Sequence, residues 1–130
     1  MAEEARALNS NIKTEVVELD VSKAAPSAYQ ALFNERQRTS IVVNNAGIMK
    51  NRLLLEQKPE LLEAMIKTNV HPYIYMTKYA MKHFKEHKEG HQHKTALLYT
   101  SSLAAEAWLP NMGVYAGTKM HNASLARMVS

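Results

Sequence analysis

A tyrosine and a lysine four residues apart are the side chains in this sequence best suited to chemistry. They lie in Tyr115-Ala-Gly-Thr-Lys119, within a stretch that favours a helix, where positions i and i+4 share one face. An isolated phenol has a pKa near ~10, and a neighbouring ammonium favours its phenolate form. Such a pair can pass a proton to or from a carbonyl or alcohol oxygen. The same spacing is common by chance on helix surfaces, so the pair alone indicates little.

Further polar residues interrupt the apolar pattern at several places, and each also has an ordinary structural explanation. Ser102 lies 13 residues before Tyr115, where its hydroxyl could orient the same substrate oxygen, but Ser101 and Ser102 could equally be loop residues. The remaining candidates are Asp20, which could be a turn or helix-cap residue, Asn44 and Asn45, which could end a strand, and Asn69, which could be a surface amide.

The elements that must position these residues alternate in type. The sequence predicts helices over 1–10, 26–33, 59–87 and 114–130, strands over 14–19, 40–43 and 95–100, and loops over 88–94 and 101–113. Pro72 should interrupt the third helix, because it has no N–H for the carbonyl of Thr68. This alternation predicts an α/β fold with a doubly wound parallel sheet. Ligands of such sheets bind beyond the carboxyl ends of the strands, where Asp20, 44–47 and 101–102 should meet.

Composition excludes several classes of protein. The chain has 130 residues, 46% of them apolar, and no cysteine, which excludes a disulfide scaffold and a cysteine zinc site. No run of about 20 apolar residues spans a membrane, and the first residues do not form a signal peptide. Asp20 is the only aspartate, which disfavours Ser-His-Asp hydrolysis. Most of the net charge of +4 lies between Lys78 and Lys94, typical of a solvated helix end rather than of nucleic-acid binding.

Histidines offer a rival site. His83 and His87 are four residues apart on the predicted helix, and His91 and His93 follow in the loop. Imidazoles at that spacing can hold zinc, but the segment is rich in lysine, which repels a cation. We therefore expect no metal site there.

Four short motifs occur in an order and at spacings that resemble the short-chain dehydrogenase/reductase family. The motifs are Val42-Val43-Asn44-Asn45-Ala46-Gly47, Thr68-Asn69-Val70, Tyr99-Thr100-Ser101-Ser102 and Tyr115-Ala-Gly-Thr-Lys119. The resemblance runs from about Thr14 to Ser130. It implies that residues 1–130 are the central portion of a single NAD(P)-binding Rossmann-like domain, with the third to fifth strands of an incomplete sheet. Leu109-Pro110 and the spacing of Asn69 from Met76-Thr77 are most similar to the 17β-hydroxysteroid dehydrogenase and very-long-chain 3-oxoacyl-CoA reductase branch.

The resemblance implies catalytic roles for four residues. Tyr115 would be the acid for carbonyl reduction and the base for alcohol oxidation. Lys119 would favour the phenolate and bind the nicotinamide ribose. Ser102, rather than Ser101, would bond the substrate oxygen, and Asn69 would hold the helix geometry and a water of the proton relay.

The resemblance also implies cofactor contacts. Asp20 and Val21 would contact the adenine ring, and Asn44, Asn45, Ala46 and Gly47 would close the adenosine side. The cofactor would be NADP or NAD, with no preference readable. The hydride chemistry itself belongs to the nicotinamide.

The glycine-rich turn of the family has no counterpart in this sequence. The four glycines, Gly47, Gly90, Gly113 and Gly117, form no G-x-x-x-G-x-G or G-x-G-x-x-G pattern after a strand. We therefore expect the 130-residue chain to bind a dinucleotide weakly by itself. Two absent strands would also place the segments 14–19 and 40–43 about 14 Å apart and leave an apolar strand edge unpaired.

These features predict an NAD(P)-dependent oxidoreductase that interconverts a carbonyl and a secondary alcohol on a hydrophobic substrate of the steroid or 3-oxoacyl-CoA type. The alternative is a catalytically inactive fragment that acts as a protein-interaction module. By resemblance, a homodimer would form through the helices at 59–87 and 114–130. The branch would imply the endoplasmic reticulum, and without that branch the expected compartment is the cytoplasm. Five methionines could supply a contact surface for a partner, but we favour packing in the core for them. They are Met65, Met76, Met81, Met120 and Met128.

Overall fold

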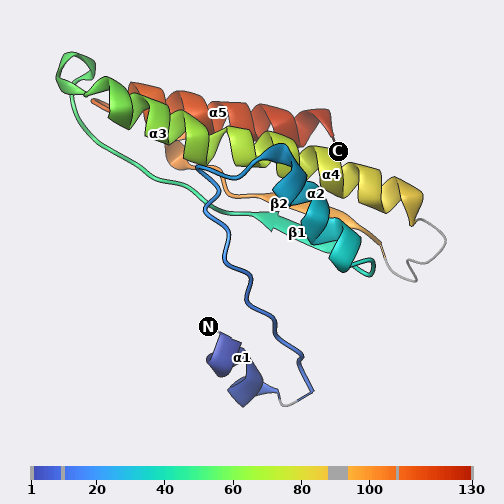
Figure 1. Cartoon of the computed structure of the whole chain (residues 1–130). Helices are drawn as coiled ribbons and strands as arrows, with labels where there is room; N and C mark the ends of the chain where they lie inside the picture. Colours follow the sequence, from blue (N-terminus) through green and yellow to red (C-terminus); the bar gives the residue numbers. More distant parts are fainter. Residues whose placement is uncertain (1, 10, 88–93, 108, 130) are drawn as a thin grey trace.

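The computed structural model describes residues 2–9, 11–87, 94–107 and 109–129 (Figure 1). Its helices and strands, in chain order, are α1 (Ala2–Leu8), α2 (Pro26–Glu35), β1 (Ile41–Asn44), α3 (Pro59–Asn69), α4 (His71–Glu86), β2 (Ala96–Tyr99) and α5 (Gly113–Met128). Two short 3₁₀ helices, Leu54–Glu56 (η1) and Leu103–Ala105 (η3), lie within connections. Most predicted elements are therefore present, with ends shifted by one or two residues.

Strands β1 and β2 pair in parallel, with Val42 opposite Leu97 and Asn44 opposite Tyr99. Helices α3 and α4 form the crossover between them, which confirms the predicted Rossmann-like α/β fold. Figure 1 shows these helices and α5 gathered on one side of the two strands. Val42 on that side is buried, whereas Val43 and Leu98, which point the other way, are 59% and 52% exposed. The sheet thus has one covered face in the described part of the chain.

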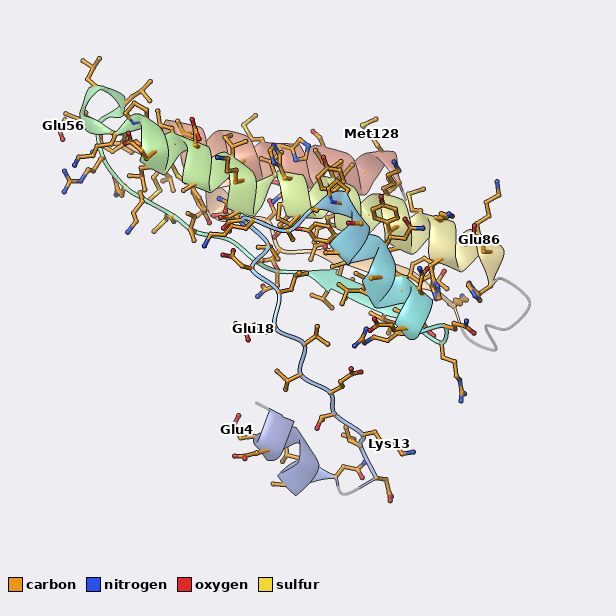
Figure 2. The ribbon with its side chains drawn as sticks, in the orientation of Figure 1. Glu4, Lys13, Glu18, Glu56, Glu86 and Met128 are labelled. Carbon is orange, nitrogen blue, oxygen red and sulfur yellow. The ribbon has the colours of Figure 1, made fainter. Side chains whose placement is uncertain are left out.

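The prediction of a strand over 14–19 was wrong. This segment has no ladder partner among the described residues, and Val16 is 80% exposed. Extended, β-prone residues form a strand of a sheet only when a neighbouring strand hydrogen-bonds to their N–H and C=O groups. Figure 1 shows the segment running away from the sheet to α1, and Figure 2 shows Lys13 and Glu18 along it. Glu15 pairs with Arg36, which follows α2.

The interruption predicted at Pro72 is present. Helix α3 ends at Asn69 and α4 begins at His71, and Val70 forms a turn between the two helices. Hydrogen bonds continue on both sides, from Val70 N to Ile66 O at 3.0 Å and from Ile74 N to Val70 O at 3.2 Å. Pro72 lacks the N–H that would continue the ladder in between. Asn69 consequently occupies the last residue of α3 rather than the middle of a long helix.

The core joins α2 and α4 to β1. Phe33, Val42 and Ala80 are buried together, with Leu97 and the methionine Met76 packed against them. Tyr29 also reaches from α2 to α4, where its ring stacks on Tyr75 with centroids 5.8 Å apart. Met65 is fully buried, as favoured for core packing, whereas three methionines are exposed: Met81 (44%), Met120 (55%) and Met128 (82%).

The histidine pair lies in this core region. His83 is buried, with its ring 5.4 Å from Phe33 and 4.4 Å from His87. Within the described residues no three His, Cys, Asp or Glu side chains gather as metal ligands, and His91 and His93 lie outside them. No helix in the described ranges is both long enough and apolar enough to cross a bilayer.

We predict that Phe33→Ala lowers the free energy of unfolding by about 3–5 kcal/mol, because it removes a ring from a packed core. Phe33→Leu should lower it by less than about 1.5 kcal/mol, since most of the volume is kept. Urea denaturation followed by circular dichroism measures both. Equal changes in the free energy of unfolding for the two variants would show that the Phe33 ring does not pack α2 against the core.

Candidate active site

The amine of Lys119 lies beside the phenol ring of Tyr115. Lys119 Nζ is 5.8 Å from the centre of the Tyr115 ring, and it donates a hydrogen bond of 2.9 Å to Thr100 O, directly after β2. Lys119 is only 4% exposed, and this burial lowers the pKa of its amine. The two side chains thus share one face of α5, as the i, i+4 spacing predicts.

Asn69 is buried rather than a surface amide. It is 0% exposed, and its Oδ1 accepts a hydrogen bond of 2.8 Å from Ile48 N. Its Nδ2 donates to Ile48 O at 2.8 Å and to Thr118 Oγ1 at 3.1 Å. Thr118 in turn donates to Tyr115 O at 2.7 Å. One amide therefore joins the end of α3, the segment after β1 and the helix that carries the tyrosine.

The segment 44–47 approaches the lysine closely. A Cβ on Gly47 would lie 3.4 Å from Lys119 Nζ and 3.5 Å from Asn69 Oδ1, so the absent side chain leaves room around the amine. The φ angle of Gly47 is not positive, so its role here is space rather than a special backbone conformation. The segment is also fastened to Thr100, whose N–H donates to Asn44 O at 2.9 Å and whose Oγ1 donates to Asn45 Oδ1 at 2.8 Å.

The two serines make different hydrogen bonds. Ser101 Oγ donates to Lys119 O at 3.2 Å, which ties the loop to α5. Ser102 Oγ accepts from Ala104 N at 3.2 Å and caps the helix η3, which packs against α5. Because Ser102 Oγ is an acceptor in that bond, its own proton is left to donate elsewhere. This difference favours Ser102 as the hydroxyl that meets a substrate.

Asp20 and Val21 form a turn apart from this group. Asp20 Oδ1 accepts from Ser22 N at 3.0 Å and from Ser22 Oγ at 2.6 Å, and these bonds lower the pKa of Asp20. Val21 O accepts from Tyr29 OH at 3.1 Å. In the described ranges, the hydrogen bonds and ion pairs of Asp20 and Val21 stay within residues 20–29. The adenine contact expected for them remains a prediction.

Sequence reasoning assigned no role to three residues around Lys119, although Thr100 and Thr118 lie within the quoted motifs. Thr100 supplies the carbonyl that accepts from the amine, and Thr118 links Asn69 to Tyr115. Tyr73 is buried on α4 and donates to the same Thr100 O at 3.3 Å. Burial, with a smaller contribution from Tyr115, raises the pKa of Tyr73. For Tyr73, the one signal in the sequence was its position four residues after Asn69.

A cavity of about 340 Å³ opens beside the first turn of α5. Its lining residues are Arg52, Leu53, Leu54, Gln57, Asn111, Gly113 and Val114. Arg52 N donates to Asn111 O at 3.2 Å, where Asn111 adopts a left-handed conformation with φ 63°. Asparagine tolerates that conformation better than most residues. This bond joins the two segments that frame the cavity next to the turn that bears Tyr115.

The residues present fit one end of a nicotinamide dinucleotide. An ammonium has three N–H donors, and Lys119 uses one of them on Thr100 O among the described residues. Asn44 is 6% exposed, and its Nδ2 has no hydrogen-bond partner in that part of the chain. Lys119 and Tyr115 could therefore hold the nicotinamide ribose side, and the segment 44–47 could lie along the adenosine side. The sequence contains no glycine-rich turn to hold the pyrophosphate.

We predict that Asn69→Ala lowers the free energy of unfolding by about 2–4 kcal/mol, because it leaves the N–H and C=O of Ile48 and the Thr118 hydroxyl without their partner. Asn34→Ala, the same change at an exposed position, should stay within about 0.5 kcal/mol of the natural chain. Chemical denaturation measures both.

Asn69→Asp gives a pH-dependent version of the same test. The introduced carboxyl can donate to Ile48 O only when protonated, and burial raises its pKa above the unfolded value of about 3.9. The folded state then binds more protons than the unfolded state between those two pKa values, so the stability of this variant should fall as the pH rises through that interval. A variant whose stability relative to the natural chain does not change with pH would contradict the buried hydrogen bonds of Asn69.

Comparison with known proteins supports the fold and the family. An uncharacterized oxidoreductase of Staphylococcus saprophyticus is 27% identical over 107 residues, which are 82% of this chain and 40% of that protein. The 3beta-hydroxysteroid dehydrogenase 2 of Eggerthella lenta is 34% identical over 83 residues, covering 60% of this chain and 31% of that protein. The structure of ElxO with NADP bound matches with a TM-score of 0.76 at 25% identity, covering 95% of this chain and 50% of ElxO.

The chain therefore spans less than half the length of the curated relatives it matches. A model of the family described as short chain dehydrogenase matches residues 1–130. Because that match covers the whole sequence, the chain belongs to the short chain dehydrogenase family.

Proposed function

We propose that this chain carries the catalytic part of an NAD(P)-dependent oxidoreductase that interconverts a carbonyl and a secondary alcohol. The observation that carries the proposal is the buried amine of Lys119, held by Thr100 O at 2.9 Å and 5.8 Å from the centre of the Tyr115 ring. A cation beside a phenol stabilises the negative charge that develops on a phenol oxygen while a proton is transferred. The pair therefore has the arrangement that proton transfer at a substrate oxygen needs.

The proton moves through Tyr115. Its hydroxyl makes no hydrogen bond with the described residues, so it can reach a substrate oxygen. In reduction Tyr115 donates its proton to the carbonyl oxygen, and in oxidation it takes the proton of the alcohol. Ser102 donates a hydrogen bond to the same oxygen and orients it. Asn69 positions Tyr115 through Thr118, and so fixes the start of α5 against the segment after β1.

A nicotinamide dinucleotide, when bound, supplies or accepts the hydride. Lys119 would donate its remaining N–H groups to the ribose hydroxyls, and 44–47 would lie along the adenosine side. The NADP in the ElxO structure supports a dinucleotide of this kind. The proposed dinucleotide is NADP or NAD.

The proposed substrate is hydrophobic, of the steroid or 3-oxoacyl-CoA type. The cavity beside α5 supports this, because Leu53, Leu54 and Val114 line it. Arg52 and Gln57 add a polar end that could hold an oxygen-bearing group of the substrate. The hydroxysteroid dehydrogenase of Eggerthella lenta and the motif resemblance to the 17β-hydroxysteroid and 3-oxoacyl-CoA branch support the same substrate class.

We predict that Tyr115→Phe lowers kcat at least about 100-fold, because it removes the group that transfers the proton. The assay uses a chimera in which this chain replaces the matching half of ElxO, with NADPH consumption measured on a panel of hydrophobic ketones. Tyr79→Phe, the same change at a half-buried position on α4, serves as the control and should keep turnover.

Full turnover in Tyr115→Phe would remove this residue from the mechanism. A chimera that folds and binds NADPH but reduces none of the ketones, with Tyr115 present, would instead favour the inactive interaction module.

We also propose a homodimer through α3, α4 and α5. Apolar side chains on these helices are exposed, among them Ile66 (39%), Ile74 (40%), Met81 (44%) and Met120 (55%). Methionine adapts easily to a contact surface.

Met120→Glu should shift the chain toward monomer in analytical ultracentrifugation, because it would place a charge in the apolar contact. Lys23→Glu changes an exposed residue outside α3, α4 and α5, and it should leave the oligomeric state unaltered. A chain that is monomeric before any substitution would contradict this dimer.

A further inference from the structure

The ring of Tyr73 lies near the Lys119 amine that the proposed mechanism uses. It is 1% exposed, and its ring packs near that of Tyr99, with centroids 6.2 Å apart. Its hydroxyl donates to Thr100 O at 3.3 Å, the same oxygen that accepts from Lys119 Nζ at 2.9 Å. A carbonyl oxygen has two lone pairs, so both donors can be accepted together.

The Lys119 amine is enclosed by two aromatic rings. Its Nζ is 5.8 Å from the centre of the Tyr73 ring and 5.8 Å from that of Tyr115. Both distances are within the range in which the electron-rich face of a ring attracts a cation. Across the described residues, no carboxylate forms an ion pair with Lys119. The rings and the Thr100 carbonyl therefore replace the water that the buried ammonium has lost.

We propose that Tyr73 is a positioning residue for Lys119. The ring of Tyr73 holds the ammonium between α4 and α5, and the hydroxyl of Tyr73 fixes the Thr100 carbonyl. The importance of this position for catalysis rests on the proposed function. The contact itself is a property of the folded chain and can be tested without substrate.

Tyr73 and Tyr115 have different roles although both are phenols near one amine. Among the described residues, these two are the titratable groups with rings near Lys119 Nζ, one from α4 and one from its own helix. The hydroxyl of Tyr73 already donates to Thr100 O, and burial raises the pKa of that phenol. Tyr73 therefore keeps its proton and remains a donor to the carbonyl, which leaves proton transfer to Tyr115.

The test is an NMR titration of the Lys119 side chain in the 130-residue chain labelled with ¹³C- and ¹⁵N-lysine. The signal is assigned by its absence in Lys119→Met. Tyr73→Leu should lower the pKa of Lys119 by about 0.5–1.5 units, because the loss of the ring destabilises the ammonium. Tyr73→Phe keeps the ring and should change that pKa by less than about 0.3 units. Tyr79→Leu, the matched change elsewhere on α4, should leave it unaltered.

A pKa of Lys119 in Tyr73→Leu within about 0.2 units of the natural chain would overturn the proposal. An equal shift in Tyr73→Phe and Tyr73→Leu would also overturn it, because the ring would then not be the stabilising group. If Tyr73→Leu fails to fold by circular dichroism, Tyr73→Met fills the same space without a ring and is titrated instead, with the same expected shift. These results do not depend on turnover, so a failure of Tyr73 to act on Lys119 is distinct from a failure of Tyr115 to transfer a proton.

Discussion

The hydrogen bond from Lys119 to the carbonyl of Thr100 is the interaction on which the site depends. A buried ammonium is unfavourable unless a fixed acceptor replaces its water. Thr100 provides that acceptor because its N–H pairs with Asn44 O and its side chain with Asn45, so the sheet itself sets the direction of the carbonyl. The place of the amine is thus determined by the pairing of β1 and β2. The position of the Lys119 amine on α5 is therefore set by the residue that follows β2.

Asn69 fixes the other side of the same region. A side-chain amide can donate and accept at once, which lets one residue satisfy both backbone groups of Ile48 and also reach Thr118. An ionised aspartate or a leucine of similar size could not donate and accept hydrogen bonds at once. The break between α3 and α4 places this amide at a helix end, where it faces the segment after β1. Positions that are distant in sequence are thereby held together by a few short hydrogen bonds rather than by a large core.

Sequence reasoning identified what depends on local pattern. Pro26 and Pro59 mark helix starts, Pro72 marks a break, and the spacing of Tyr115 and Lys119 places them on one face, all as observed. It failed at 14–19, since a strand exists only with a partner and no local pattern reveals whether one is present.

It also missed Tyr73, Thr100 and Thr118. Their roles arise from hydrogen bonds made in the folded chain: the Thr100 carbonyl accepts from Tyr73 and Lys119. The Thr118 hydroxyl accepts from Asn69 and donates to Tyr115 O. For Asp20 the structure shows the bonds of a turn, which the sequence had offered as an alternative, and the ligand contact stays a prediction.

One face of the two-stranded sheet is uncovered by the residues that the structure describes, and this affects how the folded state can be recognised in solution. Ile41, Val43 and Leu98 present apolar groups to water although the helices on the other side are packed. Dyes such as ANS fluoresce on exposed apolar surface and commonly serve as a sign of a molten globule. Here the native chain itself would bind such a dye. Compactness and ordered side chains must therefore be judged by near-ultraviolet dichroism or by NMR line shapes.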